Sequence, residues 1–340
     1  MQAEGHPLPA PPSRLRKALL AWYASAQRDL PWRRTQDPYR IWLSETMLQQ
    51  TRVAAVLPYY ERFLAKYPAA NDLAQAPEQE VLAMWAGLGY YSRARNLHAA
   101  AKLIARDGEF PRGYEAIRAL PGVGEYTAAA VASIAFGLPH AVVDGNVLRV
   151  MARLTGDPAD IGSQITRRRI RDTAQRLLDR SRPGDSNQAL MELGATVCMP
   201  REPLCRACPW SRWCVAHQRG LEFQLPVKLR KQKQVQIQRT VLIIARQGAL
   251  LLRQRSEEDS LMPGFWELPE PDQLPDARAI RLAGSFRHSI TFHNYRFDVV
   301  ESEIASTPQG YDWVSRERMG AIPLSTIARK ALRVFHDVRK

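Results

Sequence analysis

The spacing of apolar residues divides the chain into a long helical part and a shorter part with strands. Before residue 220, apolar side chains recur every three or four positions, which is the period of an amphipathic helix. In the first such stretch Ser13 can cap the helix, and one face carries Leu15, Leu19, Trp22, Tyr23 and Ala26. The same period predicts further helices at 39–50, 54–66, 77–85, 92–106, 127–136, 147–155 and 187–195.

From Thr240 onward the pattern changes to the alternation that is typical of β-strands. Two short apolar runs, 240–246 and 249–254, flank Gln247-Gly248 and predict a hairpin. A later strand has an apolar face made of Tyr295, Phe297 and Val299, and a closing helix has an apolar stripe made of Ile327, Ala331 and Phe335. This part of the chain is therefore predicted to be an α+β domain.

The segment 220–239 separates the two parts, because it is rich in Lys, Gln and Arg and has almost no core residues. The predicted organisation has four parts. These are a disordered tail at 1–12, a mainly α domain at 13–219, a linker at 220–239 and an α+β domain at 240–340.

The composition of the chain supports the division into two domains and indicates a polyanionic partner. At 340 residues with 45% apolar content, the chain can bury two cores. A net charge of +14 and a pI near 10.0 favour nucleic acid as the partner, with an anionic membrane as the rival. No apolar run approaches a membrane span, and the Pro-rich start lacks a signal or transit pattern. We therefore expect a soluble cytoplasmic protein, associated with the nucleoid if it is bacterial.

A glycine-rich turn is the first candidate for binding chemistry. Gly122 and Gly124 flank Val123 in a tight turn before the helix at 127–136. Glycine permits positive φ and close backbone approach, so N–H groups at this helix start can bind a phosphate. The helix then leads to a short apolar run that ends at Asp144. One unit therefore supplies both a phosphate-binding turn and a carboxylate.

Glu45 is the second acidic candidate, because it falls on an otherwise apolar helix face between Ile41 and Leu48. A pair of carboxylates can cut a glycosidic bond when one donates a proton and the other stabilises an oxocarbenium-like sugar. The apolar neighbours should raise the pKa of Glu45 and keep it protonated, whereas Asp144 has polar neighbours and can stay ionised. Two alternatives remain open: Glu45 could point outward, and Asp144-Gly145-Asn146 also makes an ordinary turn.

The four cysteines of the chain, Cys198, Cys205, Cys208 and Cys214, are spaced C-x6-C-x2-C-x5-C. A cytosolic chain does not use such a group for disulfides, so a metal is the physical interpretation. Structural zinc usually has two close pairs, whereas a single C-x2-C with wider gaps favours an iron–sulfur cluster over zinc. The arginines of this loop, Arg201, Arg206 and Arg212, can bind phosphates. The arginine-rich stretch 167–171 is more simply a solvated helix face.

The run Leu120-Pro-Gly-Val-Gly with Val143-Asp-Gly-Asn further along resembles the helix-hairpin-helix DNA glycosylases of the endonuclease III superfamily. Within it, Trp42-Leu-Ser-Glu and Met47-Leu-Gln-Gln-Thr resemble the MutY-type adenine DNA glycosylases. The resemblance extends from about Leu30 to about Val334. It implies a monomer that acts on double-stranded DNA with A:8-oxoguanine or A:G mispairs and carries a 4Fe-4S cluster on the four cysteines.

The resemblance also implies roles for individual residues. Tyr126 and Asn146 would organise the sugar and the attacking side, Gln50 would fill the vacated base stack, and Tyr91 would insert beside the lesion. The adenine pocket would consist of Trp32, Arg33, Leu48 and Glu192. Glu192 can accept from an exocyclic amine, which thymine and uracil lack. From the residues alone, Tyr90 and Tyr91 could instead pack at a helix junction.

Tyr126 stands where bifunctional relatives have a Schiff-base lysine, so the chain is expected to leave an abasic site without cutting the strand. In the second domain, the stretch 263–269 resembles the Gly-x-Trp-Glu-x-Pro stretch of the Nudix-like domain that reads 8-oxoguanine. No segment matches the magnesium-binding box of a working Nudix hydrolase. Where the family has Phe-Ser-His, this chain has Ile290-Thr291-Phe292, so Thr291 and the neighbouring His293 are both candidates for the lesion contact.

These features predict a monofunctional adenine DNA glycosylase of base excision repair. A thymine- or uracil-directed mismatch glycosylase would share the first domain and remains an alternative. A non-catalytic lesion-binding protein is a second alternative, although it would not need Glu45 together with Asp144.

Overall fold

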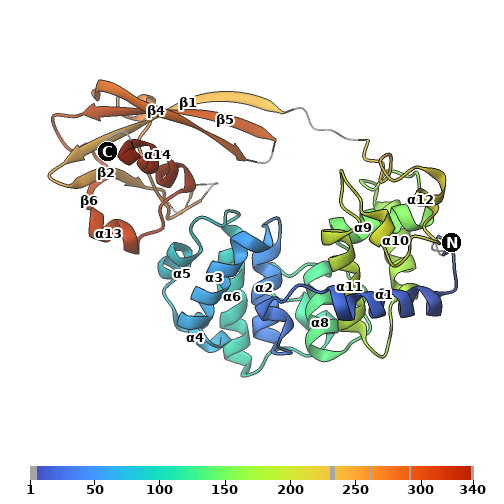
Figure 1. Ribbon diagram of the computed structural model, residues 1–340. Coiled ribbons are helices and arrows are strands. Elements are labelled where there is room, and N and C mark those ends of the chain that lie inside the picture. The colour runs from blue at the N-terminus through green and yellow to red at the C-terminus, as the bar shows by residue number, and fades with distance from the viewer. Residues whose placement is uncertain (1–5, 230–233, 257, 260–261, 291, 338–340) are drawn as a thin grey trace. The chain divides into compact units, whose positions relative to one another are not determined.

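The computed structural model describes residues 6–229, 234–256, 258–259, 262–290 and 292–337 (Figure 1). The chain forms two compact units, one made of Met1–Gln50 with Leu103–Lys231 and the other of Thr51–Lys102 with Gln232–Lys340. The predicted division placed the helices between residues 51 and 102 in the first domain. They fall in the second unit because the turn before α6 (Ser92–Asp107) packs against residues that follow the linker.

The first unit is helical throughout its described residues. Its elements are α1 (Pro12–Ala26), η1 (Pro31–Arg33), α2 (Pro38–Leu48), α7 (Tyr114–Arg118), α8 (Glu125–Phe136), α9 (Gly145–Thr155), α10 (Gln164–Leu177), α11 (Pro183–Thr196), η2 (Cys205–Ala207) and α12 (Val215–Arg219). One core of this unit joins apolar faces of α1, α9, α10 and α11. Ser13 does not cap α1; the helix starts at Pro12, whose fixed φ suits a first helical position.

The N-terminal tail is anchored rather than disordered over its described part. His6 Nε2 lies 3.3 Å from Asp157 Oδ2, and Leu8 and Ala10 pack against the core of α1, α9, α10 and α11. The prediction of a disordered tail at 1–12 is therefore wrong for residues 6–12, because apolar side chains between the prolines find a surface to cover. Residues 1–5 lie outside the described ranges.

The first half of the predicted linker also belongs to the helical unit. Leu225 is buried, and its carbonyl accepts from Arg153 Nε over 2.9 Å. The amide of Ile161 donates to the carbonyl of Val227 over 3.0 Å. Strand β1 already begins at Val235, so the linker is shorter than the predicted 220–239. Residues 230–233 lie outside the described part of the chain.

The second unit combines the helices between residues 51 and 102 with a six-stranded sheet and two later helices among its described residues. The helices that precede the sheet are α3 (Val53–Lys66), α4 (Ala70–Gln75), α5 (Glu78–Trp85) and α6. The later elements are β1 (Val235–Arg246), β2 (Ala249–Gln254), β3 (Trp266–Glu267), η3 (Pro271–Gln273), β4 (Arg278–Ile290), β5 (His293–Glu303), β6 (Tyr311–Ser315), α13 (Arg316–Ala321) and α14 (Thr326–Asp337).

The sheet has the order β3-β2-β1-β5-β4, with β6 paired to β2. Strands β1 and β5 run parallel and β4 and β5 antiparallel, and α14 packs against β4 (Figure 1). The predicted hairpin is confirmed: Gln247 and Gly248 both have positive φ, at 49° and 80°, as a two-residue hairpin turn requires. The predicted apolar faces of β5 and α14 meet in one core. The prediction of a helical part followed by a part that combines helices with a sheet is therefore confirmed.

Candidate active site

Glu45 lies in the last turn of α2 and is 5% exposed. Asp37 fixes the start of this helix by accepting from the amide of Tyr39 over 2.9 Å, with Pro38 at the first helical position. The hydroxyl of Tyr126, in the first turn of α8, donates to Glu45 Oε2 over 2.6 Å. Burial, and then the charge of Asp144, raise the pKa of Glu45 to about 7, against the opposing effect of the Tyr126 hydrogen bond. The expected raised pKa is confirmed, and Glu45 can carry a proton near neutral pH.

Asp144 is the N-cap of α9. Its carboxylate accepts from the amide of Val147 over 2.7 Å and from Asn146 Nδ2 over 3.0 Å. Burial raises the pKa of Asp144 above its ordinary value, and these two donors act in the opposite direction. The polar surroundings expected from the sequence are present, but burial of Asp144 affects its pKa more than the sequence suggested.

Arg149 links Asn146 to the first cysteine of the metal loop. Its side chain is nearly buried and donates to Asn146 Oδ1, to the carbonyl of Gly194 and to the carbonyl of Cys198, each over 2.8 Å. Asn146 in turn donates to Asp144. The position of the Asp144 carboxylate therefore depends on the backbone that leads into the cysteine loop. Sequence reasoning missed Arg149, because nothing local distinguishes it from other arginines.

Glu192 lies on α11 and is fully buried. Its carboxylate accepts from the backbone amide of Arg28 over 3.0 Å, from Arg28 Nε over 2.8 Å, and from Arg28 Nη2 and Arg33 Nη2 over 2.7 Å each. Burial alone would raise the pKa of Glu192, but these hydrogen bonds lower it to about 2. Of the other residues expected in the adenine pocket, Trp32 is buried and Leu48 is partly buried. Arg28 is a site residue that sequence reasoning did not find.

Gln50 and the glycine turn are open to a ligand. Gln50 is exposed at the end of α2 with a φ of 57°, a left-handed conformation that is uncommon for residues other than glycine. Gly122 has a φ of 73°, as expected, whereas Gly124 has a φ of −89° and serves as the N-cap of α8. Positive φ is therefore confirmed for Gly122 only. No atom lies within 4 Å of a Cβ built on Gly124, so the approach to its backbone is open.

The two tyrosines before α6 differ in their exposure to solvent. Tyr91 is 6% exposed, with its ring centroid 4.1 Å from that of Phe265 and its hydroxyl 2.9 Å from Thr326 Oγ1. Tyr90 is 47% exposed and has a φ of 50°. A ring held by Phe265 and Thr326 is not presented to solvent, so the insertion role expected of Tyr91 does not fit this structure. Tyr90 is the tyrosine that presents its ring.

The loop expected to contact the lesion is described only in part. Thr291 lies outside the described residues. Phe292 is 36% exposed, and its ring centroid lies 4.4 Å from that of His293, which begins β5. Glu267, in the Nudix-like stretch, pairs with Arg253 over 2.6 Å and with Arg255 over 2.7 Å. Its charge is therefore neutralised by arginines of this unit.

The four cysteines line one cavity, together with Arg153, His217 and Glu222. Burial raises the pKa of Cys208 to about 12 and also raises the pKa of Cys205 and Cys214. Four thiols so close together cannot all ionise unless a cation compensates their charge. Arg153 Nη1 lies 3.4 Å from Cys198 Sγ and also donates to the carbonyl of Met199 over 2.7 Å. Four convergent sulfur donors fit a soft metal centre.

Among the described residues, no helix is long and apolar enough to cross a membrane.

Comparison with known proteins places this geometry in a family. Residues 43–177 match the model of the HhH-GPD superfamily of base excision DNA repair proteins. The human adenine DNA glycosylase is 35% identical over 402 residues, which cover 94% of this chain and 73% of the human protein. The mouse adenine DNA glycosylase is 34% identical, with coverage of 96% of this chain and 78% of the mouse protein.

Solved structures of DNA glycosylases are similar to part of this chain. A thermostable thymine-DNA glycosylase has a TM-score of 0.55 and is 32% identical, covering 61% of this chain and 97% of that one. A complex of endonuclease III with DNA has a TM-score of 0.52 at 23% identity, covering 62% of this chain and 99% of that one, which shows a shared fold.

Proposed function

The chain belongs to the adenine DNA glycosylases of the HhH-GPD superfamily, enzymes that remove adenine from DNA in base excision repair, and we propose that its substrate is adenine paired with 8-oxoguanine or guanine in duplex DNA. The main observation that supports this reaction is the buried Glu45. Its burial and the nearby charge of Asp144 raise its pKa to about 7. Two carboxylates with different surroundings are what glycosidic bond hydrolysis requires.

In the proposed mechanism Glu45 acts as the general acid. Its proton passes to a ring nitrogen of the departing adenine as the bond between the base and C1′ of the sugar breaks. The bonding electrons leave with the base, so positive charge develops on the sugar and the carboxylate of Asp144 stabilises it. A water molecule then adds to C1′ and loses a proton, and an abasic site remains. Asn146 holds Asp144 in place through its 3.0 Å hydrogen bond.

Tyr126 supports the proposal that the enzyme does not cut the strand. A bifunctional glycosylase needs an amine that attacks the sugar and forms a Schiff base. Tyr126 offers a hydroxyl that is already committed to Glu45 over 2.6 Å. Its role in this proposal is to orient the acid rather than to form a covalent intermediate.

Glu192 with Arg28 and Arg33 supports adenine over thymine or uracil as the substrate base. The carboxylate is ionised and buried, and its oxygens can accept from an exocyclic amine, which thymine and uracil lack. Both oxygens are already paired with the arginines, so we propose that adenine shares the carboxylate with them, between Trp32 and Leu48. Thymine would present a carbonyl to the carboxylate and be disfavoured. Base release from an A:G duplex and from a T:G duplex separates the two substrates.

The cysteine loop fits a 4Fe-4S cluster, which we propose as the cofactor. Cys198, Cys205, Cys208 and Cys214 would hold it, and the cluster when bound would cross-link the loop between α11 and α12. Arg153 would offset part of its negative charge. Iron and sulfide analysis with visible absorbance tests this assignment, and stoichiometric zinc without iron would contradict it.

We further propose that the sheet domain is Nudix-like and reads the lesion. The stretch around Trp266-Glu267 carries the likeness, and Glu267 is paired with arginines rather than left for magnesium. His293 and Thr291 are the proposed lesion contacts, and Gln50 and Tyr90 present exposed side chains with left-handed backbone that suit insertion into the base stack. The Gly122-Val123-Gly124 turn is the proposed phosphate contact. The enzyme would act as a monomer in the compartment that holds the DNA.

The deciding experiment measures free adenine released from A:8-oxoguanine, A:G and A:T duplexes. Release from the first two but not from A:T supports the proposal. Release of thymine from a T:G duplex, without adenine release, would contradict it. In the lesion loop, His293→Ala and Thr291→Val are compared for the ratio of 8-oxoguanine to guanine rates. The loss of one hydrogen bond costs about 1 kcal/mol, so the variant that loses the lesion contact should show a rate ratio that is roughly fivefold lower.

A further inference from the structure

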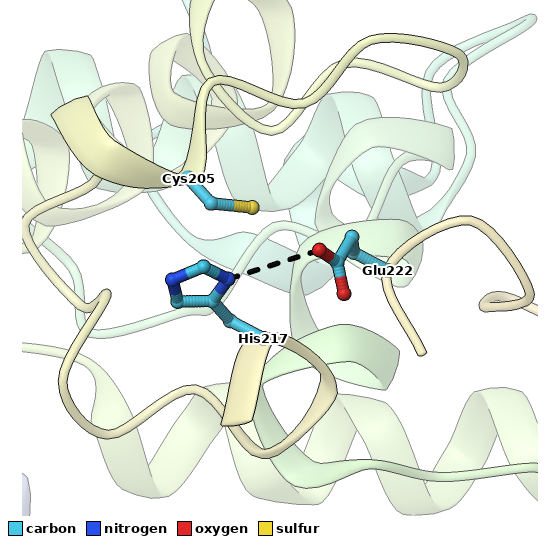
Figure 2. A group of neighbouring side chains, drawn as sticks. All are labelled: Cys205, His217 and Glu222. Carbon is cyan, nitrogen blue, oxygen red and sulfur yellow. Dashed lines mark ion pairs between the residues drawn. The ribbon is translucent and has the colours of Figure 1, made fainter. Parts of the chain in front are cut away.

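At one side of the cysteine cavity, donor atoms of three different side chains lie close together. Figure 2 shows Cys205, His217 and Glu222 with their side chains turned toward one another. Their ligand atoms all lie within 4.8 Å of one another, and His217 Nδ1 is 3.8 Å from Glu222 Oε1. Cys205 starts η2, His217 lies on α12 and Glu222 follows α12, so the local chain fold assembles the group.

Within the described part of the chain, two of these polar atoms are buried without a hydrogen bond, and His217 Nδ1 has only the 3.8 Å ion-pair contact with Glu222 Oε1. His217 Nδ1 and Glu222 Oε2 have no hydrogen bond to any residue that the structure describes. Buried polar groups in proteins are nearly always satisfied, and each exception calls for an explanation. A metal ion placed among the three side chains would supply the missing interaction to the imidazole nitrogen and the carboxylate together.

We propose that Cys205, His217 and Glu222 bind one divalent ion of the zinc type in the chain that has not yet received a cluster. A thiolate, an imidazole and a carboxylate form a mixed donor set that suits zinc and excludes calcium and magnesium, which take oxygen ligands. Zinc–ligand bonds are about 2.0 to 2.3 Å long, so neighbouring donors of a tetrahedral site lie roughly 3.3 to 3.8 Å apart. For a nitrogen–oxygen pair this separation is roughly 3.4 Å, so the 3.8 Å between His217 Nδ1 and Glu222 Oε1 would shorten slightly when zinc binds.

The zinc site and the cluster are mutually exclusive because both use Cys205. This consequence rests on the proposed cluster, whereas the site itself does not. Zinc bound to Cys205 would occupy one corner of the cysteine set and delay cluster insertion. The alternative is that a divalent ion sits on all four cysteines, in which case His217 and Glu222 would play no part.

The experiment uses the full-length chain, freed of iron without oxygen, and titrates it with cobalt(II) and then zinc. The intensity of the thiolate-to-cobalt absorption reports the number of sulfur ligands. The expected result is one thiolate per cobalt, with zinc affinity reduced at least tenfold in His217→Ala and in Glu222→Gln. Cys214→Ser is the matched control and should bind zinc as the wild type does. Four thiolates per cobalt, or a loss in Cys214→Ser with none in His217→Ala, would overturn the proposal.

Cluster reconstitution with iron and sulfide completes the test. His217→Ala should regain the wild-type visible absorbance, which shows that it is folded and that His217 is not a cluster ligand. Zinc added first should slow reconstitution of the wild type and not of His217→Ala. Equal slowing in both proteins would contradict the shared use of Cys205. A wild type that binds cobalt through one thiolate but takes up no iron would refute the cluster and leave the zinc site standing.

Discussion

Replacing Tyr126 by phenylalanine should move the alkaline limb of the pH–rate profile to higher pH. Burial and the charge of Asp144 raise the pKa of Glu45 to about 7, while the hydrogen bond from the Tyr126 hydroxyl lowers it. The donor lies 2.6 Å from Glu45 Oε2 and favours the ionised carboxylate. Phenylalanine keeps the ring and removes only the donor, so Glu45 should hold its proton to higher pH.

The magnitude follows from the strength of that bond. A hydrogen bond to a charged group contributes about 1.5 to 3 kcal/mol, and about 1.4 kcal/mol corresponds to one pH unit. Water can replace part of the lost interaction, so we expect the limb to move by about one unit, from about 7 to about 8. At pH 8 the protonated fraction of Glu45 would rise from about a tenth to about a half, because the acid fraction falls tenfold per unit above the pKa.

The assay is single-turnover adenine release under saturating enzyme between pH 5.5 and pH 9, with each profile normalised to its own plateau. The Tyr126 hydroxyl also lies 3.2 Å from Met191 Sδ, so Met191→Leu is a matched control that should leave the limb in place. Because Glu45 and Asp144 influence each other, the observed limb belongs to the pair. A limb that stays in place or moves to lower pH in Tyr126→Phe would refute the reasoning.

Three further predictions concern the same unit and the lesion domain. Asp144→Asn should reduce base release at least a thousandfold while duplex affinity changes little, and substantial turnover would place the catalytic charge elsewhere. Above pH 7, Glu45→Gln should be more stable to unfolding than the wild type by up to about 3 kcal/mol. The raised pKa of Glu45 stabilises the folded wild type below pH 4.5, and this stability is lost as the pH rises through about 7, whereas glutamine does not ionise. Urea unfolding of both proteins at pH 5 and pH 8 measures the difference. A chain that ends at Leu229 keeps the Leu225 and Val227 contacts and should release adenine from A:G, but without preference for 8-oxoguanine; a preserved preference would remove the lesion role of the sheet domain.

Local features of the chain were predictable from the sequence because local chemistry sets them. The apolar period fixed the helices and the face on which Glu45 sits, and Gln247-Gly248 has few backbone options other than a hairpin turn. Asp144 before Gly145 is a natural N-cap, and the cysteine spacing brings four thiols to one cavity. Each of these depends on residues that are close along the chain, with the cysteines of 198–214 as the widest case, so no knowledge of the rest of the fold was needed.

Only the tertiary structure decided which neighbours these residues meet. The pKa of Glu45 depends on burial by other elements, and Glu192 pairs with Arg28 across 164 positions of chain. Tyr90 and Tyr91 are alike in sequence, yet packing against Phe265 buries one and leaves the other exposed. Residues 6–12 are held in place by contacts with residues far along the chain, such as the pair of His6 with Asp157. Desolvation, ion pairing and packing act between elements that are far apart along the chain, and a periodic pattern contains no information about those encounters.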